Sequence, residues 1–240
     1  MRRLDQVNAL QAIDNPLSVI LSVKPQLENL SILDVGCGEG QLARVLAAHG
    51  AKVLGIDPGP EIIARARLNA PDARFLVGTA EELPRSLHGY DVVTMVNALH
   101  HVPVNLMDSA LREAARVLRR EGVLIVIEPE ARGSFFDALK IVEDETEVRQ
   151  AAQAALHAVV SRGDWVSAQT LAYTRTEMFG DADEFIARIL AVDPSRQEAA
   201  GINRQAVTAA VARCASKNED GRLLLEQPTI ANVLMPATRT

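Results

Sequence analysis

The sequence predicts an α/β protein with a doubly wound, mostly parallel sheet. Short apolar runs alternate with helical patterns between residues 32 and 128, an order typical of parallel strands connected by helices. The first apolar run, residues 32–35, ends in glycines at positions 36, 38 and 40, and a helical pattern follows. A strand, a glycine turn and a helix in this order form the nucleotide pocket of doubly wound sheets.

The second apolar run, residues 53–56, ends at Asp57. A carboxylate at this position can accept hydrogen bonds from both hydroxyls of a ribose. Glycines in the preceding turn allow a positive φ and let a ligand approach the bare backbone. Further strands are expected at residues 74–77, 91–96 and 123–127, with helices near 41–49, 60–69 and 104–120.

The spacing of the glycines separates two classes of nucleotide. The dinucleotide fingerprint G-x-G-x-x-G, counted from Gly36, requires a third glycine at position 41, which is Gln41. Asp34 and Glu39 add carboxylates that would repel a pyrophosphate. They would instead suit a ligand that carries an ammonium, a sulfonium and a ribose, as S-adenosylmethionine does.

On these residues the chain resembles the class I S-adenosylmethionine-dependent methyltransferases, whose first motif is acid-x-Gly-x-Gly-x-Gly. It is similar in particular to the small-molecule methyltransferases related to the ubiquinone-pathway group. The resemblance covers about residues 30–130 and implies a Rossmann-like seven-stranded sheet with an antiparallel last strand. It also implies S-adenosylmethionine as the cofactor and methyl transfer to a small-molecule acceptor. The implied cofactor-binding residues are Asp34, Gly36, Cys37, Gly38, Gly40, Asp57, Pro58, Thr79, Ala80, Glu81, Asn97 and Ala98.

One position departs from the family pattern. The family usually has Asp where this chain has Thr79, and a hydroxyl holds the adenine amino group more weakly than a charged acceptor does. Two alternatives therefore stay open: an S-adenosylmethionine-binding protein of the same fold without catalysis, and an NAD-linked oxidoreductase. Gln41 in place of glycine counts against NAD.

The composition of this 240-residue chain limits the classes of molecule that it is expected to bind. A formal charge of −6 and a pI of about 5.4, without a basic stripe, argue against nucleic acid. Two cysteines far apart in sequence favour a reducing cytoplasm. No signal peptide and no bilayer-spanning stretch is expected, so a membrane partner is not predicted. The pattern is compatible with a homodimer.

The ends of the chain extend this core. We expect one methyltransferase domain over residues 1–240, with an N-terminal helical segment at 1–29 and a helical cap insertion at 131–216. Within that insertion, residues 166–176 are rich in threonine and are expected to be extended. Two apolar runs around residues 226–228 predict a terminal hairpin.

The acceptor side is less well defined. His100 and His101 follow the fourth strand, in a loop that borders both cofactor and acceptor in the family; the resemblance implies that His101 could act as a base. No third ligand stands at a recognisable spacing, so no metal site is predicted. Trp165 and Tyr173 are candidates for lining the acceptor pocket, because aromatic residues make up only 3% of the chain.

Overall fold

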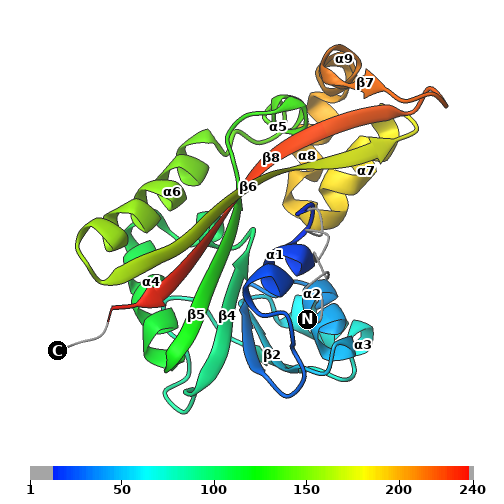
Figure 1. Cartoon of the computed structure of the whole chain (residues 1–240). Helices are drawn as coiled ribbons and strands as arrows, with labels where there is room; N and C mark the ends of the chain where they lie inside the picture. Colours follow the sequence, from blue (N-terminus) through cyan, green and yellow to red (C-terminus); the bar gives the residue numbers. More distant parts are fainter. Residues whose placement is uncertain (1–12, 238–240) are drawn as a thin grey trace, which may run out of the picture.

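The computed structural model describes residues 13–237. Its central sheet has seven strands in the order β3-β2-β1-β4-β5-β8-β6, with the short β7 paired to β8 outside this path (Figure 1). Strands β1 to β5 pair in parallel, and β8 is antiparallel to both of its neighbours. This confirms the predicted Rossmann-like sheet. The strands are β1 Ser31–Val35, β2 Lys52–Asp57, β3 Arg74–Val77, β4 Tyr90–Val96, β5 Leu118–Pro129, β6 Trp165–Phe179, β7 Ser216–Lys217 and β8 Leu223–Pro236.

Helices cover both faces of the sheet because the buried strands carry apolar side chains on both faces. In β1, Ile32 packs into a cluster with α1 (Pro16–Val23), α2 (Gln41–Ala48) and α3 (Pro60–Asn69). The next residue, Leu33, points to the opposite face and packs with α4 (Met107–Val117) and α6 (Thr146–Ser161). This alternation follows from the two-residue period of a strand.

The last two long strands extend beyond the rest of the sheet. Their distal halves carry a third hydrophobic cluster, which includes Phe135, Phe179 and Phe185, and they form the elongated upper right of the molecule (Figure 1). The helices in this region are α5 Ser134–Leu139, α7 Ala182–Val192, α8 Gln197–Ile202 and α9 Arg204–Cys214. The described residues also form the 3-10 helices η1 Leu99–His101 and η2 Val104–Leu106 after β4, and η3 Pro194–Arg196 after α7.

The prediction of a helical cap over 131–216 is wrong in part. Strand β6 belongs to the central sheet, as the threonine-rich pattern at 166–176 indicated, and α6 covers that sheet beside α4. Only α5 and the helices that follow β6 form the separate distal cluster. Helical composition alone could not separate a helix that covers the sheet from one that lies beyond it.

The predicted terminal hairpin is also wrong, because β8 runs without a break through residues 226–228. Pairing with β5 begins at Thr229, one residue after Pro228. Pro228 therefore lies just outside the segment of β8 that pairs with β5. The N–H that proline lacks is not needed for a hydrogen bond to β5, and strands tolerate proline at such positions.

The N-terminal helical segment is described from residue 13 onward, and the rest of that prediction, residues 1–12, lies outside the described residues. Helix α1 begins after Asn15, whose side chain accepts a hydrogen bond from the Ser18 backbone N–H at 3.0 Å. Pro16 at the first helical position needs no backbone partner. Within residues 13–237, no helix is long and apolar enough to cross a bilayer.

Candidate functional site

The glycine turn joins β1 to α2 at the carboxyl end of the sheet. Gly36 and Gly38 have φ of +73° and +53°. A Cβ on Gly36 would come within 2.5 Å of the Ala98 Cβ, whereas a Cβ on Gly38 would meet only open space. Gly40 has φ +79°, and its Cβ would lie 2.9 Å from the Phe75 ring. The turn therefore needs glycine for conformation at all three positions, and for space at Gly36 and Gly40.

Asp57 ends the neighbouring strand β2 and points at this turn. Its side chain is nearly buried. One oxygen accepts a hydrogen bond from the Gly38 N–H at 3.1 Å, and the other accepts from the Gly59 N–H at 3.0 Å. These two bonds fix the orientation of the carboxylate. Each oxygen keeps a second lone pair, so a ligand hydroxyl can still donate to it.

Asp34 is the buried acid of the turn, only 2% exposed. The Thr94 hydroxyl donates to Oδ1 at 2.7 Å, while Oδ2 is buried without a hydrogen-bond partner in the described part of the chain. Burial raises the pKa of Asp34 to about 6; the Thr94 hydrogen bond opposes this rise and the charge of Asp57 adds to it. An unpaired carboxylate oxygen in this position fits a cationic ligand group and is unfavourable for a pyrophosphate.

The loop after β4 forms the opposite wall. Asn97 has φ +51° and its N–H donates to the Ile127 carbonyl at 2.8 Å. Glu128, fully buried at the end of β5, accepts hydrogen bonds from the N–H groups of Ala98 at 3.0 Å and Leu99 at 2.8 Å. Its other oxygen contacts the His100 Nδ1. Glu128 thus holds the whole loop in place.

Sequence reasoning missed this role of Glu128. A signal existed, because an acid directly follows the apolar run of β5, and β5 pairs in parallel with β4. The carboxyl ends of parallel neighbours meet at one edge of a sheet. An acidic side chain there can reach the loop that follows the neighbouring strand.

The two histidines have different surroundings. The His100 side chain is buried against Glu128, whereas the neighbouring His101 is exposed. Desolvation by the surrounding protein is the main cause that lowers the pKa of His101, and the charge of His100 lowers it further. The negative charges of Glu145 and Glu128 raise this pKa and so oppose the shift. The lowered pKa favours the neutral form of the His101 imidazole, which is the form that can accept a proton.

The predicted adenine-binding residues lie after β3, next to the end of β2. Asp57 pairs with Val77 at the end of β3, which brings the loop after β3 to the same edge of the sheet as the Asp57 carboxylate. Thr79, Ala80 and Glu81 are half-buried there. Pro58 is exposed beside Asp57.

Cys37 lies inside the turn and is nearly buried. Desolvation, with the charges of Asp34 and Asp57, raises the pKa of its thiol far above the usual range. The thiol is therefore protonated and unreactive, and the position contributes backbone and volume to the turn rather than a nucleophile.

The two aromatic candidates, Trp165 and Tyr173, lie at opposite ends of the sheet. Trp165 opens β6 opposite Pro236 and is buried in the core between the sheet and α6. Since β6 runs parallel to β5, this is the amino end of the sheet, and Trp165 does not line the acceptor side. Tyr173 pairs with Thr229, which pairs with Pro129 at the carboxyl end of β5. Tyr173 is half-buried, and desolvation raises the pKa of its phenol to about 12, so the phenol stays protonated.

A buried ion cluster beside the histidines was also missed. Glu145 accepts from Arg149 at 2.6 Å and from Arg196 at 2.7 Å, and all three side chains are buried. Arg149 further donates to the Glu130 carbonyl at 3.0 Å. The cluster connects the start of α6 to η3 and to the end of β5. Pairing between residues 51 positions apart leaves no local pattern in the sequence.

Metal ligation has no support in the part of the chain that the structure covers. Across residues 13–237, no group of three or more His, Cys, Asp or Glu side chains is placed to hold a metal ion.

Comparisons with known proteins agree with this geometry. Residues 32–122 match a family described as a methyltransferase domain. An uncharacterized methyltransferase of Synechocystis is 36% identical over 108 residues, covering 42% of this chain and 51% of that protein. A ubiquinone biosynthesis O-methyltransferase of Azorhizobium caulinodans is 40% identical over 110 residues, covering 44% and 42%. The chain thus matches about half of these relatives' length.

Solved structures extend the likeness to the whole fold. The YcgJ protein of Bacillus subtilis is 21% identical with a TM-score of 0.62, covering 93% of this chain and 98% of that one. A methyltransferase of Geobacter sulfurreducens, solved with S-adenosylhomocysteine, is 18% identical with a TM-score of 0.56, covering 93% and 92%. At these identities the likeness shows the fold.

The parallel sheet with its reversed strand β8, and the acidic glycine turn beside Asp57, define the class I methyltransferase fold. Residues 32–122 are similar to the methyltransferase domain of this family, and the matched relatives include a ubiquinone biosynthesis O-methyltransferase.

Proposed function

We propose that the protein transfers a methyl group from S-adenosylmethionine to a small-molecule acceptor. The observation that carries this proposal is the buried Oδ2 of Asp34, which has no partner among the described residues and lies beside a turn that only glycine can form. A cationic cofactor group would satisfy that oxygen. Asp57, oriented by two backbone N–H groups, would hold the ribose.

When bound, the cofactor supplies a methyl group activated by its sulfonium. The chain's own residues then mainly position the acceptor, and orientation can contribute about 7–11 kcal/mol to such a step. Glu128 holds the loop at residues 97–101 rigid against the cofactor side. His101, in its neutral form, takes the proton that a hydroxyl acceptor loses. Relatives named as O-methyltransferases favour a hydroxyl acceptor.

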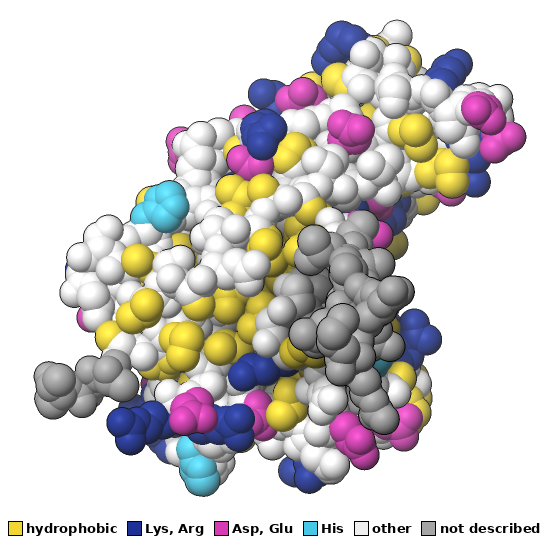
Figure 2. Space-filling view, in the orientation of Figure 1, with side chains coloured by type: hydrophobic (Ala, Val, Ile, Leu, Met, Phe, Trp, Pro, Cys, Tyr) yellow, Lys and Arg dark blue, Asp and Glu magenta, His cyan; other side chains and the backbone are white. Residues whose placement is uncertain are grey.

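The remaining parts of the molecule have proposed roles in the same reaction. Residues 1–240 would act as one domain, with Tyr173 and the histidines lining the acceptor side and the distal helices α7 to α9 closing it. Among the described residues β6 is the outermost strand of the sheet, and this edge favours a homodimer. Val166 on β6 and its pairing partner Met235 on β8 are exposed, and Figure 2 shows apolar side chains gathered over the centre of one face.

A second function, cofactor binding without catalysis, is favoured by one residue only. Thr79 stands where the family usually has Asp, and a neutral hydroxyl would hold adenine less tightly. An NAD-linked oxidoreductase fits less well, since the unpaired Asp34 carboxylate would face a pyrophosphate.

Titration calorimetry with S-adenosylmethionine, S-adenosylhomocysteine and NAD tests the cofactor. We expect the first two to bind and NAD not to bind; preferential binding of NAD would refute the proposal. Release of S-adenosylhomocysteine across a panel of phenols, hydroquinones and amines then tests transfer. His101→Asn should lower turnover of a hydroxyl acceptor without changing cofactor affinity. Cofactor binding with no turnover of any panel member would favour the binding protein.

A further inference from the structure

The two adjacent histidines of η1 are in contact with each other. Their ring centroids lie 4.1 Å apart at an interplanar angle of 42°, so the exposed His101 ring packs against the buried His100 ring. The His100 side chain is enclosed by protein, because the residue is only 4% exposed. The group that holds His100 therefore also determines how the His101 ring lies.

His100 is held by Glu128, which is fully buried at the end of β5. The His100 Nδ1 contacts one carboxylate oxygen of Glu128, while the other oxygen accepts from the backbone N–H groups of Ala98 and Leu99. Since a carboxylate can only accept, the Nδ1 of His100 carries the proton and donates it in this hydrogen bond. Orientation of a base by a further group that is itself fixed is a recurrent arrangement in catalytic sites. The contacts thus run from β5 through His100 to His101.

Charges from several elements act on the His101 ring. The described residues that carry them are His100 in η1, Glu128 at the end of β5, Glu145 before α6, Asp193 after α7 and Arg196 in η3. Glu145 is neutralised within the buried ion cluster, and Glu128 forms its ion pair with His100. Without His100, the buried charge of Glu128 would act on His101 unopposed and favour the protonated form of that ring.

We propose that His100 is a positioning residue for methyl transfer: held by Glu128, it fixes the orientation of the His101 ring and keeps that ring free to accept a proton. This inference rests on the proposed transfer to a hydroxyl acceptor, in which His101 takes the proton. It gives the buried histidine a role that anchoring the loop does not require, because Glu128 already holds the loop backbone through Ala98 and Leu99.

The variant His100→Asn separates this role from a purely structural one. The asparagine amide can still donate to Glu128, so the loop keeps its anchor, but the ring and its charge are lost. We expect the pKa of His101, measured by NMR titration of its imidazole, to rise by at least about 0.5, as for the loss of a charge on a ring whose centroid lies 4.1 Å away. The acid limb of kcat/KM for a phenol of the acceptor panel should move to higher pH by the same amount, since this limb reports the base.

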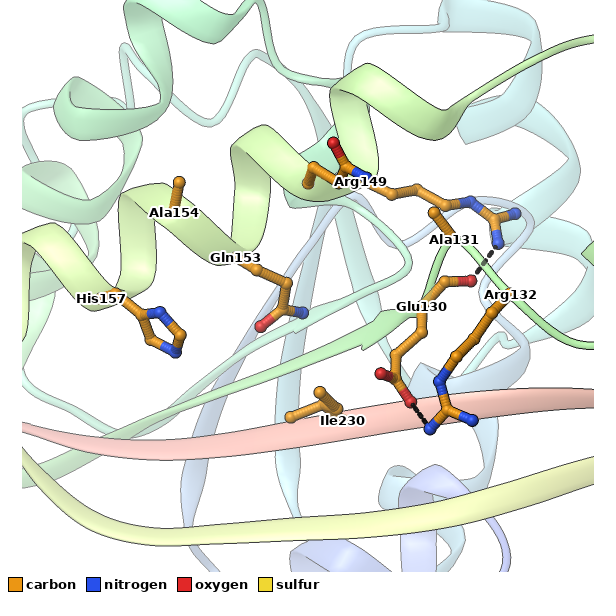
Figure 3. A pocket seen from close by; sticks show the side chains of 9 residues that line it. Glu130, Ala131, Arg132, Arg149, Gln153, Ala154, His157 and Ile230 are labelled. Carbon is orange, nitrogen blue, oxygen red and sulfur yellow. Dashed lines mark hydrogen bonds and ion pairs between the residues drawn. The ribbon is translucent and has the colours of Figure 1, made fainter.

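The matched control is His157→Asn. His157 is an exposed histidine on α6 that lines a separate cavity with Gln153 and Glu130 (Figure 3), and its replacement should leave the pKa of His101 and the pH profile unchanged. The resonance of His101 is identified by its loss in His101→Asn. The variant His100→Gln carries the same amide on a longer side chain, and it replaces His100→Asn if circular dichroism shows that the first variant is unfolded.

The two measurements separate this inference from the proposed transfer. An unchanged pKa of His101 in His100→Asn, or an equal shift in His157→Asn, would overturn the positioning role and leave methyl transfer intact. A raised pKa without a shift of the acid limb would overturn it too, because His101 would then not be the group that takes the proton. If no member of the acceptor panel is turned over, the proposed transfer fails, whereas a raised pKa would still show that His100 controls the charge of His101.

Discussion

Replacing Glu128 tests how the acceptor-side loop is held. Glu128→Ala leaves the buried N–H groups of Ala98 and Leu99 without their acceptor, and His100 without its partner. Each buried donor left without an acceptor costs about 1–3 kcal/mol, so the loss of Glu128 should lower the unfolding free energy by about 3–5 kcal/mol in all. This is a large share of the total stability of a domain, about 5–15 kcal/mol. Glu128→Gln keeps one oxygen for the two N–H groups and should cost less.

Urea denaturation followed by circular dichroism measures these differences as shifts in the transition midpoint. Glu121→Ala is the matched control, because Glu121 lies on the same strand but is exposed, and it should change the unfolding free energy by less than about 0.5 kcal/mol. A double-mutant cycle with His100→Leu should show a coupling of about 1 kcal/mol or more. If Glu128→Ala costs no more than Glu121→Ala, the carboxylate does not hold the loop and the reasoning fails.

Four further predictions follow, three on the cofactor side and one on the acceptor side. The pKa of Asp34 in the folded protein, about 6, lies above its unfolded value of 3.8. Protonated Asp34 therefore contributes about 3 kcal/mol to the free energy of unfolding below pH 4, and this contribution is lost as pH rises through 6. Denaturation of Asp34→Asn at different pH values should lack this loss, and the affinity of the variant for S-adenosylmethionine should not rise between pH 5 and 7. Asp57→Ala should weaken cofactor binding by about 1.5–3 kcal/mol in calorimetry, and unchanged affinity would remove the ribose assignment. Gly36→Ala should lower the melting temperature more than Gly38→Ala, because only the first Cβ meets another atom; equal losses would show that backbone conformation alone decides. Cofactor plus acceptor should slow amide hydrogen exchange across residues 182–214 more than cofactor alone, and identical exchange would place the acceptor elsewhere.

Local patterns predicted the part of the fold that local chemistry determines. The strand at residues 32–35, the glycine turn and Asp57 are close in sequence, and each has a physical signature that one chain can show. The register of parallel strands then brings Asp57 and the turn together without further information. For the same reason the order of helices and strands up to β5 was predictable.

The remainder depends on contacts between distant residues. Whether residues 223–236 form a hairpin or one strand is decided by pairing with both β5 and β6, and a proline between two apolar runs is compatible with either. Trp165 was expected near the acceptor because it is rare, but rarity says nothing about which end of a strand a residue occupies. The Glu145–Arg196 pair joins α6 to η3, and no spacing rule connects them.

These distant contacts converge on the loop that follows β4. Its backbone is held by Glu128 from β5, and its histidines lie beside the ion cluster that joins α6 to η3. Buried charged pairs contribute little net stability compared with apolar packing, so the Glu145–Arg196 pair matters chiefly because it fixes how η3 docks against the start of α6.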